Sequence, residues 1–198
     1  MIRQVIPYAQ SRDRIQSGDV LLFRGTGSVA WCVSVVTKSP YNHAALAAWW
    51  GDVLMCVETR GLRNARAVVL SSQVRAYPCR IDVYRYALPT RFRIETPSIV
   101  PGSPLPARAA AWAIRKTCTT YGWWAIVRAL VQRFPGSRLI WRPSTNDTRP
   151  GPLDCSALCS NSYRHAGDDL CPGLSDTDTT PADLATSKKL NYVFTIGR

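Results

Sequence analysis

The sequence predicts an α+β fold in which an antiparallel sheet packs against helices. Strand-like apolar segments separated by turn residues occupy residues 18 to 87, and helical patterns dominate after residue 105. Segregation of strands from helices along a chain is typical of α+β proteins. The 198 residues and 46% apolar content suit one folded domain spanning residues 1–198.

The first strands are marked by their turns. GDVLLFRG (18–25) runs from a Gly-Asp turn through an apolar core and stops at Gly25. TGSVAWCVSVVTKS (26–39) has the apolar spacing of a short helix, although its β-branched residues leave a strand possible. Residues 43–50 and 53–58 are apolar runs joined by Gly51-Asp52, a dipeptide typical of hairpin turns, so we expect antiparallel neighbours.

Two further strands are expected at RAVVLSS (66–72) and CRIDVYRYA (79–87). In the second, Ile81 and Val83 share one face of the strand. Arg85 falls on this apolar face and makes the alternation imperfect.

The second half of the chain alternates between proline-rich loops and helices. Loops are expected at 95–106 and 142–152, helices at 106–118, 122–134 and 153–166, and a last strand at 191–197. The third helix should open at Asp154 and close before Gly167. The loop and helices between about 95 and 152 are interpreted as an insertion into the single domain.

The charge is strongly positive. Lys and Arg number 25 against 13 Asp and Glu, a net charge of +12. Such a field attracts polyanions, so an anionic polymer or membrane surface is a possible partner. Because the basic residues are spread along the chain, no dedicated nucleic-acid site is predicted.

No apolar run reaches the ~20 residues that a membrane span needs, and the first residues lack the pattern of a secretory signal. We therefore expect a cytoplasmic protein or one associated with a phage particle. Seven cysteines is an odd number, without the even framework of a disulfide-stapled domain. Cys32, Cys56 and Cys79 have apolar neighbours and are predicted to be small buried residues.

LDCSALCS (153–160) is the most informative motif. Asp154 can cap the helix, which places Cys155 in its first turn, where the helix dipole and unpaired backbone N–H groups favour a thiolate. These N–H groups could also stabilise an oxyanion. Cys159, one turn further along, should point to the same face at greater depth and is interpreted as core packing. Cys155 is therefore the candidate nucleophile.

A thiolate nucleophile needs a base, and the chain has two histidines. His165 lies ten residues beyond Cys155, about 15 Å along the same helix, so His43 is the better candidate. Pairing across the Gly51-Asp52 turn places Glu58 opposite residue 45, on the face that carries His43. Glu58 is therefore the candidate that orients the imidazole.

Five motifs in this order resemble the circularly permuted relatives of papain-like NlpC-type cysteine peptidases and amidases, a group that includes YiiX-like and lecithin retinol acyltransferase-like proteins. They are GDVLLF, SPYNHAAL, VETRG, LDCSAL and TPADLA. The resemblance implies a permuted papain-like fold, a nucleophile at Cys155, a base at His43 and an orienting residue at Glu58. Residues 95–141 match no part of the family pattern.

Together these features predict a cysteine hydrolase that cleaves an amide bond without a cofactor. The resemblance implies a cell-wall peptide as substrate, with an acyl substrate in a thiol acyltransferase or a lipid amidase or esterase as the alternative. Trp112, Trp123 and Trp124 could line an acyl groove, although a helix core is the preferred interpretation.

Two hypotheses of other classes remain open. Cys155, Cys159, His165 and Cys171 are residue types that suit zinc, in a spacing unlike the usual fingers. The positive charge, seven Trp and eight Tyr could instead serve a non-enzymatic nucleic-acid or surface-binding protein.

Overall fold

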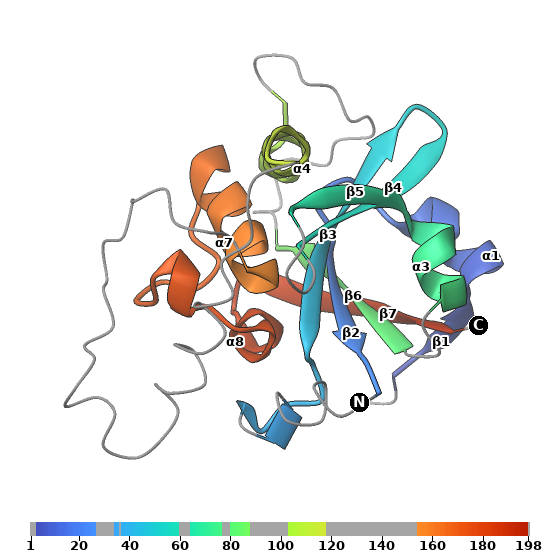
Figure 1. Ribbon diagram of the computed structural model, residues 1–198, viewed down its shortest axis with the longest axis horizontal. Coiled ribbons are helices and arrows are strands. Elements are labelled where there is room, and N and C mark those ends of the chain that lie inside the picture. The colour runs from blue at the N-terminus through green and yellow to red at the C-terminus, as the bar shows by residue number, and fades with distance from the viewer. Residues whose placement is uncertain are drawn as a thin grey trace.

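The computed structural model describes residues 3–26, 34–35, 37–59, 64–76, 80–87, 103–117 and 154–197. Its centre is a seven-stranded sheet in the order β1-β7-β6-β2-β3-β4-β5 (Figure 1). The strands are β1 (Val5–Pro7), β2 (Val20–Arg24), β3 (His43–Trp50), β4 (Val53–Glu58), β5 (Arg66–Val69), β6 (Arg80–Tyr86) and β7 (Leu190–Gly197). Neighbouring strands are antiparallel except at one edge, where β1 and β7 are parallel.

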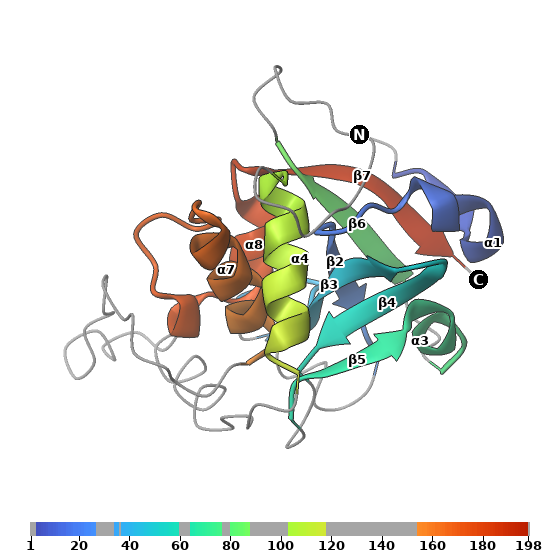
Figure 2. The ribbon, with the colours of Figure 1, turned by 90° about the horizontal axis from the view of Figure 1, so that it is seen from above.

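Helices cover both faces of this sheet. They are α1 (Tyr8–Ser11), the 3₁₀ helix η1 (Arg12–Arg14), α3 (Leu70–Ala76), α4 (Leu105–Arg115), α7 (Cys155–Ala166), the 3₁₀ helix η2 (Asp176–Asp178) and α8 (Pro181–Thr186). Figure 1 shows α4, α7 and α8 on one side and α1 and α3 on the other. Figure 2 shows α4 lying alongside α7. The predicted α+β class is confirmed.

Strand alternation divides the core into two clusters. Residues of β2 and β3 at even positions, such as Leu22 and Ala44, pack with Ala157 and Leu158 of α7. Their odd-numbered neighbours belong to a second cluster that includes Leu70 of α3. Alternate residues of a strand face opposite sides, so both faces of these strands are buried. This double burial explains why β2 and β3 read as continuous apolar runs.

The predicted hairpin is confirmed. Strand β3 pairs antiparallel with β4, with Trp50 opposite Val53 and Leu46 opposite Val57. Gly51 occupies the turn with φ +55°, a conformation that glycine adopts without steric cost. The register therefore continues to Glu58 opposite position 45, as expected.

The strand predicted at RAVVLSS is only half right. Strand β5 ends at Val69, and Leu70 already belongs to α3. Leu70, Gln73 and Val74 are the buried residues of this helix, at the i, i+3, i+4 spacing of one helical face. Because β-branched residues directly precede Leu70, the sequence does not show where the two-residue period of the strand gives way to the helical period.

Strand β6 is confirmed, and its imperfect alternation has a structural reason. Arg85 donates through Nε and Nη2 to the two carboxylate oxygens of Asp19, at 2.8 and 2.7 Å. Asp19 is buried immediately before β2. A buried carboxylate requires a cationic or hydrogen-bonding partner. Arg85 therefore lies on the apolar face because it pairs with Asp19.

Part of the predicted insertion is seen to belong to the core. Helix α4 contributes Ala109, Ala110 and Ala113 to the same cluster as α7. The rest of this region, residues 88–102 and 118–153, lies outside the described residues, as do the helix predicted at 122–134, Trp123 and Trp124. The same holds for most of the short helix expected at 26–39, and for Cys32 and Cys79.

Near the C-terminus, α8 was not anticipated, whereas the last strand, β7, is confirmed. Thr180 and Asp183 form a capping box at the start of α8, with Pro181 in the first helical position. The T-x-x-D spacing is the signal that could have predicted this helix. Within the described ranges, no helix combines the length and apolarity that crossing a membrane requires.

Candidate active site

The N-terminus of α7 is built as its sequence predicts. Asp154 is the N-cap, and its Oδ1 accepts a hydrogen bond from the backbone N–H of Ala157 at 2.6 Å. Gly167 closes the helix with φ +110°. Burial raises the pKa of Asp154 to about 6, although the hydrogen bonds from Ala157 and Ser156 act in the opposite direction.

Cys155 is the first residue of this helix. Its thiol is free and half-buried, and it lies close enough to the side chain of His43 to raise the pKa of that imidazole. The first backbone N–H groups of a helix have no partner within the helix, so they present positive potential beside the sulfur. Cys155 thus combines access to solvent with a cationic neighbour and a helix N-terminus.

His43 is the first residue of β3 and is buried, with its ring 5.1 Å from that of Phe23 between centroids. Its Nε2 lies 2.8 Å from Oε2 of Glu58, which leaves Nδ1 for Cys155. Burial lowers the pKa of His43, but the hydrogen bonds and charges of Cys155 and Glu58 outweigh it and raise the pKa to about 9. The geometry favours an imidazolium between two acidic groups.

Glu58 is fully buried at the end of β4 and has a second partner, Arg66. Arg66 opposes Glu58 in the β4–β5 register and donates to Oε1 through Nε at 3.0 Å and Nη2 at 2.6 Å. Burial would raise the pKa of Glu58, but His43 and Arg66 together lower it. The carboxylate therefore stays ionised and keeps one oxygen for each partner.

Sequence reasoning missed Arg66. Its strand was predicted, but the connection between β4 and β5 left the register open, so no pairing with Glu58 could be inferred. The available signal was the basic residue Arg66 on the strand that follows Glu58.

The other candidates lie elsewhere. His165 stacks on Trp112 of α4 with ring centroids 4.6 Å apart, away from Cys155. Trp112 itself packs against the core. Cys159 is fully buried, and burial raises the pKa of its thiol well above the usual value, which fits core packing.

In the described part of the chain, no three His, Cys, Asp or Glu side chains are grouped to hold a metal ion. Cys155, Cys159, His165 and Cys171 all lie in this part, so the alternative zinc set is not assembled. The catalytic residues predicted from the sequence, by contrast, meet at one place.

Comparison with known proteins supports the fold. No protein-family model matches the chain, and no curated protein is significantly similar in sequence. Among solved structures, the chain is similar to the metalloprotein YiiX from Escherichia coli O157:H7 (DUF1105), with a TM-score of 0.59 and 14% identity. The match covers 93% of this chain and 99% of YiiX. The fold is therefore YiiX-like, in agreement with the permuted papain-like fold expected from the sequence motifs.

Proposed function

We propose that this protein is a cysteine hydrolase that cleaves an amide bond, with peptides of the bacterial cell wall as the substrate class that the sequence resemblance implies. One observation carries the proposal. A half-buried thiol at a helix N-terminus lies beside a buried histidine, whose Nε2 is 2.8 Å from the carboxylate of Glu58. This arrangement supports the proposal, because thiol catalysis requires a nucleophile, a base and a group that orients the base.

In the first half of the reaction, the Cys155 thiolate attacks the carbonyl carbon of the amide. The negative charge moves to the carbonyl oxygen, which the backbone N–H of Cys155 at the start of α7 can stabilise. His43 then gives its Nδ1 proton to the leaving nitrogen as the C–N bond breaks. The products are a free amine and a thioester on Cys155.

In the second half, neutral His43 accepts a proton from water, and the resulting hydroxide attacks the thioester carbonyl. The C–S bond breaks, which releases a carboxylic acid and restores the thiolate and imidazolium. Glu58 remains ionised throughout. Its carboxylate orients the ring of His43 and stabilises the positive charge of that ring. Arg66 holds the second oxygen of Glu58, so the carboxylate has one fixed orientation.

Amine release from a set of cell-wall peptides tests the proposal. We expect wild-type protein to release amines, and Cys155→Ala to lose this activity while its thermal unfolding stays unchanged. Cys171→Ala is the matched control, because Cys171 is a buried free cysteine that takes no part in the Cys155–His43 pair. This variant should retain activity. Turnover by Cys155→Ala at the wild-type rate would refute the assignment.

A further inference from the structure

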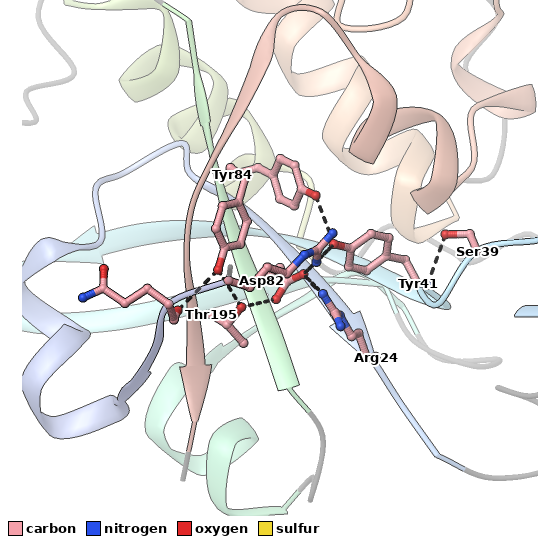
Figure 3. A network of polar contacts seen from close by, with 9 residues as sticks. Arg24, Ser39, Tyr41, Asp82, Tyr84 and Thr195 are labelled. Carbon is pink, nitrogen blue, oxygen red and sulfur yellow. Dashed lines mark hydrogen bonds and ion pairs between the residues drawn. The ribbon is translucent and has the colours of Figure 1, made fainter. Parts of the chain in front are cut away.

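A second polar cluster lies at the same end of the sheet and has no part in the proposed reaction. Asp82 of β6 is fully buried, and Figure 3 shows the side chains that converge on it. Its Oδ1 accepts a hydrogen bond from Thr195 at 2.6 Å. Its Oδ2 accepts hydrogen bonds from Arg3, Arg24 and Tyr41. We call these five residues the Asp82 cluster.

The cluster holds more positive charge than its carboxylate balances. Arg3 and Arg24 share the single charge of Asp82, a formal surplus of one positive charge. Burial raises the pKa of Tyr41, so its hydroxyl remains a neutral donor. Since a carboxylate offers about four acceptor positions, Asp82 is saturated by its four donor residues.

Both arginines retain unused donors on their exposed sides. Hydrogen bonds occupy Nη1 of Arg3 and Nε and Nη2 of Arg24. Within the described segments, the remaining guanidinium N–H groups have no protein acceptor, although a guanidinium carries five donors. The side chain of Arg3 is 41% exposed and that of Arg24 is 25% exposed, so a ligand from solvent can reach both.

Aromatic rings hold the two guanidiniums in place. Arg3 lies over the rings of Tyr41 and Tyr192, at 5.8 and 5.3 Å from their centroids. Arg24 lies over the ring of Tyr41 at 5.4 Å. A guanidinium fixed by stacking and by a buried carboxylate loses little conformational entropy when it binds a further group.

Strand register places the cluster near the candidate active site. Phe23 of β2 pairs with His43 on one side and with Ile81 on the other. Arg24 and Asp82 are the residues that follow Phe23 and Ile81. Because neighbouring strands lie about 4.8 Å apart, the backbone positions of the cluster are roughly 5 to 10 Å from that of His43. The side chains of Arg24 and Asp82 point to the sheet face that α7 covers, because Leu22, which pairs with Asp82, packs with α7. Cys155 is the first residue of this helix.

We propose that Arg3 and Arg24 form a subsite for a carboxylate of the substrate. The proposal rests on the proposed function, which it deepens by requiring that the substrate carry a negatively charged group besides the scissile amide. A planar carboxylate matches the forked N–H groups of the guanidiniums. Asp82 and Tyr41 preorganise the subsite, and the surplus charge makes it attractive to an anion.

The kinetic experiment compares two peptides that differ only in a carboxylate replaced by a carboxamide. We expect Arg24→Gln to lower kcat/KM for the carboxylate peptide about tenfold or more, and to leave the carboxamide peptide unchanged. Arg24→Lys should recover part of the loss. Arg12→Gln is the matched control, because Arg12 contacts Asp13 and Trp49 outside the cluster. Equal effects on both peptides would overturn the proposal.

A binding experiment tests the subsite without turnover. In Cys155→Ala protein, titration with N-acetylglycine should shift the Nε–H NMR signal of Arg24 with saturation, and N-acetylglycinamide should not. Arg24→Gln should weaken N-acetylglycine binding measured by calorimetry. Absence of binding, or binding of inorganic phosphate alone, would overturn the carboxylate subsite. Because this readout needs no catalysis, failure of the proposed function alone would leave N-acetylglycine binding intact.

Discussion

Nε2 of His43 lies 2.8 Å from Oε2 of Glu58, across the β3–β4 hairpin. The two-residue turn at Gly51-Asp52 sets the register that brings them to one face of the sheet. A residue inserted in this turn would shift the register and move Glu58 to the opposite face. The orientation of the histidine therefore depends on a local feature of the sequence.

The charge of Glu58 should set the alkaline limit of activity. Glu58→Gln removes that charge, so the pKa of His43 should fall from about 9 and the alkaline limb of the pH–rate profile should move to lower pH. We also expect kcat to fall about tenfold or more, because the amide cannot orient the imidazolium equally well. A pH–rate profile with an unmoved alkaline limb would contradict this role.

The same interaction should appear in stability. The pKa of His43 is raised from 6.5 to about 9 in the folded protein, so its contribution is fully present below pH 6.5. The contribution is lost as the pH rises through about 9. Urea unfolding of wild type and His43→Gln across this range should show the difference between them shrinking with increasing pH. A constant difference would show that His43 has an ordinary pKa.

Arg66 should keep Glu58 ionised. Its bonds help to lower the pKa of Glu58, so the stabilisation by this carboxylate is present above the unfolded pKa near 4.5 and is lost as the pH falls through the lower, folded value. In Arg66→Gln the loss should begin at higher pH, with destabilisation of about 1–2 kcal/mol near neutrality. Chemical unfolding at several pH values measures both effects. Arg75→Gln, on the last turn of α3, is the matched control.

Asp154 should show the opposite pH dependence. Its folded pKa is raised from 3.8 to about 6, so its contribution to stability is greatest below pH 3.8 and is lost as the pH rises through 6. Asp154→Asn retains an N-cap without the buried charge, so its stability relative to wild type should improve from pH 4 to pH 7. Asp154→Ala should cost about 1 kcal/mol through loss of the cap. Urea unfolding curves provide the measurement.

Metal removal should leave activity unchanged. The proposed steps use only Cys155, His43 and Glu58. The test is informative because YiiX, a structural neighbour, is described as a metalloprotein. Dialysis against a chelator should preserve the rate of amide cleavage, and added zinc should inhibit by binding the thiolate. Loss of activity on chelation, with recovery on metal addition, would show that the reaction needs a metal.

The sequence predicted the parts of the site that local patterns determine. The Gly51-Asp52 turn fixed the pairing of Glu58, and the Asp154 cap fixed the start of α7, because each depends on residues close together in the chain. Arg66 and the Asp82 cluster depend on pairing between strands that no short turn specifies. Arg3 and Asp82 are far apart in sequence, so only the folded sheet brings them together.

The secondary-structure errors have a similar origin. Leu70–Ala76 directly follows the apolar strand β5, which ends in Val68 and Val69, so the predicted strand extends to residue 72. The helix forms because Leu70 and Val74 bury one face against the sheet. Tertiary burial therefore decided the element, whereas the T-x-x-D capping signal of α8 was present in the sequence and overlooked.

The most direct measurement is the rate at which iodoacetamide alkylates Cys155, compared between wild type and His43→Ala near pH 6 by mass spectrometry of the modified peptide. In the proposed reaction His43 activates the sulfur of Cys155, so wild-type Cys155 should react about tenfold faster or more than Cys155 of the variant, while the buried Cys159 remains unmodified in both. Equal alkylation rates in the two proteins would contradict the pairing of Cys155 with His43.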